Sequence, residues 1–315
     1  MVINFMDIER AAERIAAYAY RTPVLRSAYL DDLTGTRVAF KCENLQRAGA
    51  FKFRGACNAV FALPDDIAAR GVVTHSAGNH GAALALAAKL RGIPASVVVP
   101  EGTVKSKSDA IREYGAALHF CAPTLAAREA ECARVQRETG ATLVHPFADP
   151  AVIAGQGTAA LELIRDVGEL DAVMTPVSGG GLIGGTAIAA RALLPRIAVF
   201  AAEPEGAADA IESLRRGERV TDVVPDTICD GLRASIGAVN FDLLCEFAVR
   251  VLPVSDAETI AAMRLIFERL KLVVEPSSAT VLAVLLRHRE HFAGRRVGVI
   301  LSGGNVDLDH LPWQS

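Results

Sequence analysis

Several patterns that mark whole classes of protein are missing from this sequence. None of its six cysteines forms a CxxC pair and its seven histidines are scattered, so the spacing fits neither a zinc site nor a disulfide framework. The basic residues form no stripe and the net charge is −3, which argues against a nucleic acid partner. No apolar run reaches the length of a membrane span, and the early acids are not typical of a signal peptide. We therefore expect a cytoplasmic protein with reduced cysteines that binds neither nucleic acid nor membrane.

The residues that are present predict a large α/β protein. Hydrophobic residues make up 51% of the 315 positions and charged residues 22%, which allows a sizeable core. Short apolar strands alternate with helical segments, and this predicts mainly parallel sheets flanked by helices. The block 67–148 has a strand–helix cycle of its own, so we expect two sheets. The expected strands include 37–43, 94–99, 117–121, 142–145, 172–177, 196–202 and 296–301, with a helix at 156–167.

One lysine stands in an unusual setting. Lys52 lies between Phe51 and Phe53 in the segment NLQRAGAFKFRGA, residues 44–56. A lysine held against an aromatic ring and partly out of water has a lowered pKa, because desolvation favours the neutral amine, and a neutral amine is a nucleophile. The same pattern is also compatible with an exposed lysine at the start of an amphipathic helix, and this segment alone favours neither interpretation.

A glycine-rich loop follows one of the buried strands. The loop, PVSGGGLIGG at 176–185, precedes a helix, so backbone N–H groups and the helix N-terminus could hold a phosphate there. Gly179, Gly181 and Gly184 also satisfy the dinucleotide fingerprint. Glu203 follows about twenty residues later, where that fingerprint places an acid. An NAD-binding domain is therefore an alternative at this stage.

Three further loops carry polar groups at strand ends. Ser76 and Asn79 in THSAGNHG suit a small anion such as a carboxylate, although either could simply cap a helix. Ser302 places a hydroxyl at the mouth of a buried strand, in a segment that also fits an ordinary glycine turn. Glu203 and Asp209 could hold a hard cation together with a carbonyl between them, or could form a solvated acidic loop.

In combination, these segments resemble the pyridoxal-phosphate-dependent serine/threonine dehydratases and the related serine racemases. The likeness runs from about Ile15 to the C-terminus, and a Rossmann oxidoreductase would have no use for most of the motifs. It implies the fold type II architecture of tryptophan synthase β, a homodimer, and an active site between two domains. The large domain would comprise residues 1–66 plus 149–315 and the small domain residues 67–148. The shared motifs are ENLQRAGAFKFRGA, SAGNHG, HPFADPAVIAGQGTAALEL, PVSGGGL, AAEPEGAADA, TICDGL, KLVVEPSSA and LSGGNVDL.

The resemblance implies how the cofactor, pyridoxal 5′-phosphate (PLP), is held. Lys52 would bind it as a Schiff base and later take the proton from the substrate Cα. A serine at the pyridine nitrogen cannot protonate that nitrogen as an aspartate would, so prompt loss of a β-hydroxyl is favoured over a long-lived carbanion. The implied contacts are Phe51 beside the ring, Asn79 at the 3′-hydroxyl, Ser178, Gly179, Gly180, Gly181 and Leu182 around the phosphate, and Ser302 at the pyridine nitrogen.

The resemblance also implies a cation site and a substrate loop. Glu203, the carbonyl of Ala207 and Asp209 match a site for a divalent cation such as Mg²⁺, Mn²⁺ or Ca²⁺. Arg128 aligns with an arginine that some racemases place near the substrate carboxylate, and it is equally compatible with a surface position on a helix. The loop that would take the substrate carboxylate consists of Ser76, Ala77, Gly78, Asn79 and His80.

Three departures from the family pattern bear on the reaction. Racemases of this family carry a serine where this chain has Ala77, and that serine is the acid/base on the face opposite the lysine. Alanine transfers no proton, so we expect racemisation to be weak. Phe147 stands where a racemase has asparagine and where dehydratases commonly have phenylalanine. Ala50 replaces a serine, and GAFKFRGA together with EPSSA resembles dehydratases that act on 3-hydroxyaspartate.

We therefore predict a PLP-dependent dehydratase for a small β-hydroxy amino acid. L-Threonine or L-serine would give the 2-keto acid and ammonia by α,β-elimination. The alternative within this class is a 3-hydroxyaspartate dehydratase, which would release oxaloacetate and ammonia. Serine racemase and an NAD-dependent oxidoreductase are further alternatives. A non-catalytic amino-acid-binding protein is disfavoured because Lys52, Asn79 and Ser302 are all present.

Overall fold

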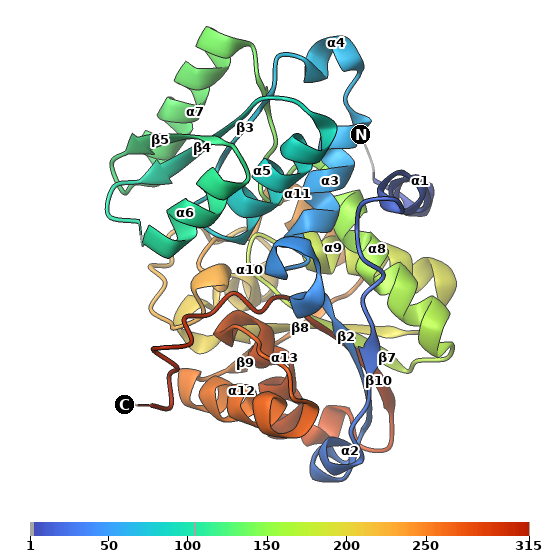
Figure 1. The fold of residues 1–315 in the computed structure, drawn as a ribbon. Helices are drawn as coiled ribbons and strands as arrows, with labels where there is room; N and C mark the ends of the chain where they lie inside the picture. The colour runs from blue at the N-terminus through green and yellow to red at the C-terminus, as the bar shows by residue number, and fades with distance from the viewer. Residues whose placement is uncertain (1–2, 104, 315) are drawn as a thin grey trace.

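The computed structural model describes residues 3–103 and 105–314, and it contains two β-sheets with helices on both faces (Figure 1). The predicted α/β fold is confirmed. The larger sheet has six strands and the smaller has four. From one edge to the other, the larger sheet consists of β1 (Val24–Leu25), β2 (Arg37–Cys42), β10 (Arg296–Leu301), β7 (Ala172–Pro176), β8 (Ala198–Pro204) and β9 (Arg250–Val254).

Both faces of the larger sheet are buried. Its neighbouring strands run parallel, except for the antiparallel pair β1 and β2. Along β8, Val199 and Ala201 belong to one core cluster, whereas Phe200 and Ala202 belong to the other, because successive side chains point to opposite faces. The first cluster is completed by helices α1 (Phe5–Ile15), α8 (Pro150–Val167), α9 (Gly181–Leu193) and α11 (Ala238–Glu246), and the second by α2 (Ala28–Thr34), α12 (Asp256–Leu270) and α13 (Pro276–Arg287).

The smaller sheet is entirely parallel and lies in the upper half of Figure 1. Val73 and Val98 pack against one helix on one face, and Val97 and Val99 pack against two helices on the other. The strands, in order across the sheet, are β5 (Ala117–Cys121), β4 (Ala95–Pro100), β3 (Val72–His75) and β6 (Thr142–Leu143), and the covering helices are α7 (Leu125–Thr139) on the first face and α5 (Asn79–Arg91) and α6 (Lys105–Glu113) on the second.

Helix α3 (Lys52–Ala62) joins the two halves of the fold. It packs against both α5 and α8, and its Phe53 and Val60 lie in one cluster with Val72 of the small sheet. The lysine singled out by the sequence is therefore the first residue of a helix that is fixed on two sides. Two shorter helices, α4 (Asp65–Ala68) and α10 (Asp209–Arg216), complete the set.

Several element boundaries differ from the sequence prediction; for example, the strand expected at 196–202 is observed at Ala198–Pro204. Helix α8 begins at Pro150 instead of residue 156, because the Asp149 carboxylate accepts the Ala151 N–H at 2.8 Å and caps the helix. The sequence prediction missed the first turns of this helix because glycine disfavours a helix. A Cβ on Gly155 would lie 2.6 Å from the Arg54 carbonyl oxygen, so glycine is required for α8 to approach α3. Strand β6 is also shorter than expected and ends at Leu143.

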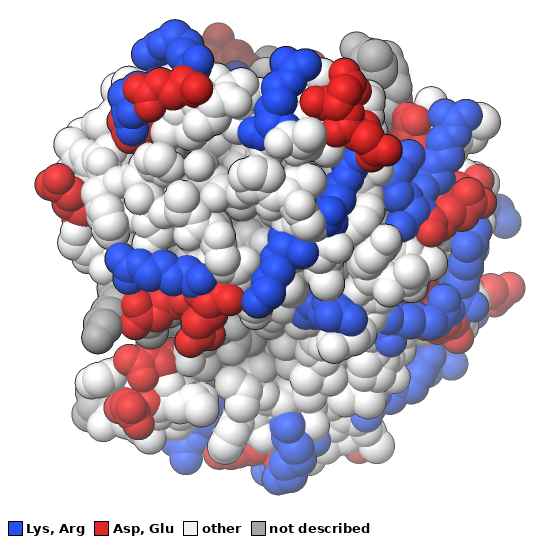
Figure 2. Space-filling model, turned by 45° about the horizontal axis from the view of Figure 1, so that its top comes forward, with Lys and Arg blue, Asp and Glu red and all other residues white. Residues whose placement is uncertain are grey.

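The surface carries charges of both signs. On the face drawn in Figure 2, Lys and Arg side chains are interspersed with Asp and Glu. Among the described residues, no helix has both the length and the apolar character that a membrane span requires.

Candidate active site

Lys52 lies in a setting that lowers its pKa. Its Nζ donates a hydrogen bond to the Pro146 carbonyl at 2.9 Å and lies 5.1 Å from the centre of the Phe51 ring. Burial lowers the pKa of the amine to about 8, although the nearby Glu275 carboxylate opposes this shift. A large fraction of the amine is therefore neutral under mildly alkaline conditions. The geometry fits the interpretation of Lys52 as a nucleophile and not that of a solvated lysine at a helix start.

The chain before Lys52 is anchored to the C-terminal strand. Ala48 and Gly49 both have left-handed backbone conformations, with φ of 57° and 70°, and they turn the chain sharply. The Phe51 N–H then donates to the Ser302 carbonyl at 2.9 Å, just beyond the end of β10. Ser302 is 3% exposed, and within the described parts of the chain its hydroxyl has no hydrogen-bond partner. A hydroxyl placed beside the Lys52 loop in this way can serve a ring nitrogen.

Glu275 is a site residue that the sequence reasoning missed. It is buried at the N-terminus of α13, and both of its carboxylate oxygens lie 3.0 Å from the Asn79 amide nitrogen. A Cβ on Gly303 would lie 2.7 Å from the Glu275 Oε1, so only glycine fits beside this carboxylate. A sequence signal did exist, because Glu275 is the one charged residue in the apolar segment LVVEPSSA.

Asn79 is held from both sides. While its amide nitrogen donates to Glu275, its Oδ1 accepts from the Asn305 amide at 2.9 Å. The same Asn305 nitrogen donates to the Ala48 carbonyl at 2.8 Å. One asparagine thus connects the lysine loop, the C-terminal loop and the start of α5. This fixes the orientation of the Asn79 side chain that is expected to meet the cofactor.

No side chain of the SAGNHG loop caps α5, the helix that follows the loop. The N-cap of α5 is Gly78, without a side-chain hydrogen bond, so neither Ser76 nor Asn79 caps the helix as the simpler interpretation required. The loop residues Ser76, Ala77 and Gly78 remain at the open end of the helix, where an anion is stabilised. His80 is buried and neutral, because burial and then the Lys52 charge lower its pKa to about 3.

The glycine loop lies between β7 and α9. Its cap residue Gly180 has a φ of 90° and supplies no side-chain cap, so the first N–H groups of α9 point toward an open end. A Cβ on Gly179 would lie 2.2 Å from the Phe147 ring, which shows how closely that ring covers the loop. The Ser178 hydroxyl exchanges hydrogen bonds with the backbone of Ala234 at 2.9 and 3.0 Å. Together with Gly181 and Leu182, this arrangement fits a phosphate.

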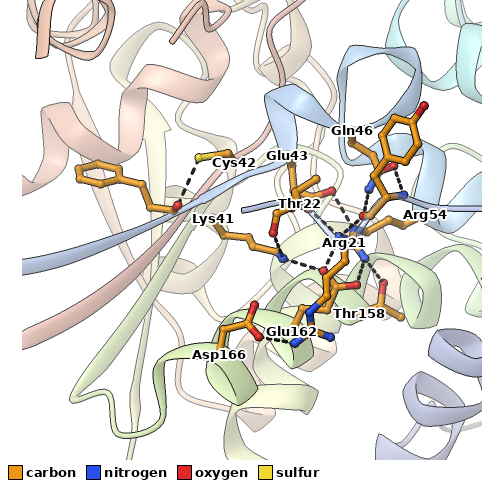
Figure 3. Close-up of polar contacts among 12 residues, drawn as sticks. Arg21, Thr22, Lys41, Cys42, Glu43, Gln46, Arg54, Thr158, Glu162 and Asp166 are labelled. Carbon is orange, nitrogen blue, oxygen red and sulfur yellow. Dashed lines mark hydrogen bonds and ion pairs between the residues drawn. The ribbon is translucent and has the colours of Figure 1, made fainter. Parts of the chain in front are cut away.

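A buried ionic network fixes α3 directly after Lys52 (Figure 3). Arg54 has no exposed side-chain surface, and its guanidinium forms two hydrogen bonds with Glu43, at 2.7 and 2.8 Å, and two with Glu162, both at 2.8 Å. Lys41 also contacts Glu162, at 2.6 Å. Despite its burial, the pKa of Glu162 is lowered because Arg54 and Lys41 stabilise its charge. The two positive and two negative side chains balance each other, and of the four only Glu162 is partly exposed.

The two acids proposed for a cation are buried together. The Glu203 carboxylate accepts N–H groups from Ala210 and Ile211 at 2.8 and 2.9 Å, and Asp209 accepts the Ile236 N–H at 2.7 Å. Burial, with Asp209 nearby, raises the pKa of Glu203 to about 8, and burial raises that of Asp209 to about 6. This excludes the alternative of a solvated acidic loop. No group of three or more His, Cys, Asp or Glu suited to a metal exists among the described residues.

Arg128 lies at the margin of this region. It is half-buried on α7, and its Nε lies 3.4 Å from the Thr124 carbonyl in the same helix. After burial, the charge of Arg128 is the next cause that lowers the pKa of His75, the residue that immediately precedes Ser76. In the described part of the chain, no hydrogen bond joins Arg128 to the SAGNHG loop. Arg128 therefore acts on His75 through its charge, and the structure does not show which group of a ligand it would bind.

Comparison with known proteins assigns the family. The family model described as "Pyridoxal-phosphate dependent enzyme" matches residues 15–303. The beta-hydroxyaspartate dehydratase of Paracoccus denitrificans (strain Pd 1222) is 49% identical over 310 residues, which cover 98% of each chain. The structure of maize serine racemase superposes with a TM-score of 0.96 at 44% identity, covering 98% of this chain and 95% of that one. The structure of a threonine deaminase from T.th. has a TM-score of 0.91 at 42% identity, covering 96% and 99%. This chain belongs to the family of pyridoxal-phosphate dependent enzymes.

Proposed function

We propose that this protein is a PLP-dependent dehydratase that converts a small β-hydroxy amino acid to a 2-keto acid and ammonia. The observation that carries the proposal is the Lys52 amine, which is positioned by the Pro146 carbonyl and the Phe51 ring and has a pKa of about 8. An amine with this pKa can accept a proton near neutral pH and return it. A beta-hydroxyaspartate dehydratase and a threonine deaminase among the relatives support elimination as the reaction type.

The residues around Lys52 fit the cofactor of this family. The bound cofactor supplies an electron sink that weakens the bonds at the substrate Cα. We assign the phosphate to the uncapped start of α9 and the pyridine nitrogen to the unpartnered hydroxyl of Ser302. Asn79, held by Glu275 and Asn305, offers its amide toward the ring hydroxyl. Lys52 then takes the Cα proton on its own side of the substrate.

The residue on the opposite face favours elimination over racemisation. Racemisation needs a second proton donor and acceptor across the substrate plane from Lys52. By the resemblance to racemases we assign Ala77 to that position, and a methyl group transfers no proton. Loss of the β-hydroxyl needs no group on that face, because Lys52 can pass the proton taken from Cα to the departing hydroxyl, which leaves as water. The lysine alone can therefore complete an elimination but not an efficient inversion at Cα.

A narrower candidate is 3-hydroxyaspartate. It is favoured by the relative that is 49% identical over the whole length, whose name states this activity. A substrate with two carboxylates needs a second cationic or N–H-rich partner beside the loop. Arg128 is half-buried on α7, its charge helps to lower the pKa of His75 at the end of β3, and it is the residue we propose for this contact.

A panel of four substrates tests both candidates. Purified protein with PLP and Mg²⁺ is incubated with L-serine, L-threonine, and threo and erythro 3-hydroxyaspartate, and the released keto acid is identified. Pyruvate or 2-oxobutyrate would establish a serine/threonine dehydratase, and oxaloacetate alone a hydroxyaspartate dehydratase. Arg128→Met is expected to raise KM for 3-hydroxyaspartate and to leave the monocarboxylates unchanged. Keto acid from none of the four would contradict the proposed substrate class.

We also propose a divalent cation between Glu203, the Ala207 carbonyl and Asp209. Two buried carboxylates with raised pKa values are stabilised when a cation replaces the protons they would otherwise bind. Hard cations prefer oxygen ligands of this kind. Asp209 also accepts the Ile236 N–H, so a cation there would support the segment that lies against the glycine loop.

The domain division is proposed on the basis of the two sheets. Every strand of the smaller sheet lies within 67–148, and every strand of the larger sheet lies within 1–66 or 149–315. The homodimer and the cytoplasmic location remain predictions from the sequence.

The pKa of Lys52 makes cofactor capture depend on pH. Only the neutral amine attacks PLP, so the rate at which the apoprotein captures PLP should rise with pH and level off above about 8. Glu275→Gln removes the negative charge that raises this pKa while keeping an oxygen for Asn79. The midpoint of the rate profile should therefore move to lower pH, as measured by absorbance in stopped flow. Glu113→Gln, at an exposed position, is the control and should leave the midpoint in place. An identical midpoint for Glu275→Gln would show that its charge does not reach the amine.

A further inference from the structure

Asn240 is a buried amide that neither the motifs nor the proposed chemistry include. It lies in the first turn of α11 and has no exposed surface. Its Nδ2 donates to the carbonyl of Gly179 at 2.6 Å and to the carbonyl of Phe147 at 2.8 Å. Both neighbours are hydrogen-bond acceptors only, so the amide nitrogen must face them; the reverse orientation would place oxygen against oxygen.

The two carbonyls belong to opposite ends of the proposed cofactor site. Gly179 is in the glycine loop assigned to the phosphate. Phe147 directly follows Pro146, whose carbonyl accepts the hydrogen bond from Lys52. The segment that contains Pro146 and Phe147 leads from the small sheet into α8, whereas the glycine loop belongs to the larger sheet. The two hydrogens of one amide group therefore connect the phosphate end and the amine end of the site.

Asn240 packs closely against two glycines of the loop and of α9. A Cβ on Gly180 would lie 2.5 Å from the Asn240 Cβ, and one on Gly184 would lie 3.1 Å from its Oδ1. That Oδ1 is buried and has no hydrogen-bond partner in the described parts of the chain. An unpaired buried carbonyl oxygen is costly, and a leucine of similar volume would avoid the cost. The two hydrogen bonds that the Asn240 amide nitrogen donates are what offsets the cost of its unpaired oxygen.

We infer that Asn240 is a positioning residue that locks the glycine loop to the Pro146–Phe147 segment, so that the phosphate cradle and the Lys52 amine keep one fixed separation. Gly237 supports the same carbonyl of Gly179 through its N–H at 3.1 Å, and the Phe147 ring packs directly on the loop, whereas Asn240 hydrogen-bonds to the backbone of both segments. The inference rests on the proposed function only in that PLP binds at this site, and it requires no particular substrate.

The test compares two variants with a matched control. Asn240→Asp keeps the shape but directs a carboxylate at two carbonyls, and Asn240→Leu removes both donors. Thr186→Val is the control, because Thr186 is equally buried on α9 and its hydroxyl has no hydrogen-bond partner among the described residues. The dissociation constant of PLP from each apoprotein is measured by fluorescence titration, together with the visible absorption band of the bound cofactor and the thermal midpoint of each apoprotein.

Both Asn240 variants should weaken PLP binding roughly 10- to 100-fold, the effect of two lost hydrogen bonds, whereas Thr186→Val should stay within about twofold of wild type. The absorption band should shift only in the Asn240 variants. For Asn240→Asp, the deficit relative to wild type should shrink at low pH, where the new carboxyl gains a proton and can donate again. Wild-type affinity in a folded Asn240→Asp protein, or a deficit independent of pH with an unchanged band, would overturn the inference. Failure of the wild-type protein to bind PLP would instead refute the proposed function.

Discussion

Replacing Lys52 with alanine is expected to lower keto acid production by about 10⁴-fold or more, because loss of a positioned proton-transfer group alone costs about 10²- to 10⁴-fold and the attachment point of the cofactor is lost as well. The fold should survive, since among the described residues the Lys52 side chain makes one hydrogen bond, to Pro146, and belongs to no ionic network. The measurement is the initial rate of keto acid release at saturating PLP. Borohydride reduction followed by intact mass measurement should add the cofactor mass to wild type only.

A lysine-to-alanine change elsewhere provides the control for this experiment. Lys89 is exposed near the end of α5 and donates a hydrogen bond to the Glu113 carbonyl, so Lys89→Ala should retain wild-type activity and cofactor attachment. If Lys52→Ala kept a normal rate, or if reduction still attached the cofactor to that variant, another lysine would be the reactive one. The buried amine of Lys41 would then be the next residue to replace.

The parts of the site that the sequence predicted are those in which a local pattern carries the physical reason. Lys52 stands beside Phe51 in the chain, and the same ring lies 5.1 Å from its amine in space. The glycine loop was recognisable because its glycines, a preceding strand and a following helix are consecutive. Each of these features requires only neighbours in sequence. Hypotheses about the chemistry of these residues can therefore be made from the sequence before the fold is known.

The parts that the sequence did not predict depend on contacts between distant segments. Glu275 and Asn79 are 196 positions apart, and Asn240 lies 61 positions from Gly179. In the sequence, no residue next to Glu275 or Asn240 indicates which distant residue it contacts. The early start of α8 was missed for a related reason, since Gly155 opposes a helix locally and is required only by the approach of α3. Tertiary packing overrides propensity at such positions.

Arg54 shows how contacts between distant segments support the start of α3 beside Lys52, and its removal should be the most destabilising single change. Arg54→Leu would leave Glu43, which is fully buried, without its guanidinium partner and would weaken the hold on Glu162. Removing one partner of a buried ion pair costs about 3–5 kcal/mol, because the remaining charge stays out of water. Urea unfolding of the apoprotein should show a loss of this size relative to wild type.

The comparison that isolates charge from packing is a second substitution at Glu43. Adding Glu43→Gln to Arg54→Leu removes the uncompensated negative charge, so the double variant should be more stable than Arg54→Leu alone, although Glu43→Gln in the wild-type background should be destabilising. Arg134→Leu is the control, because Arg134 pairs with Glu131 and Glu138 on the exposed face of α7 and should unfold like wild type. Simple addition of the two single losses would mean that Arg54 acts through its packing. A gain in stability from the second change would mean that charge balance beside Lys52 is what holds the start of α3.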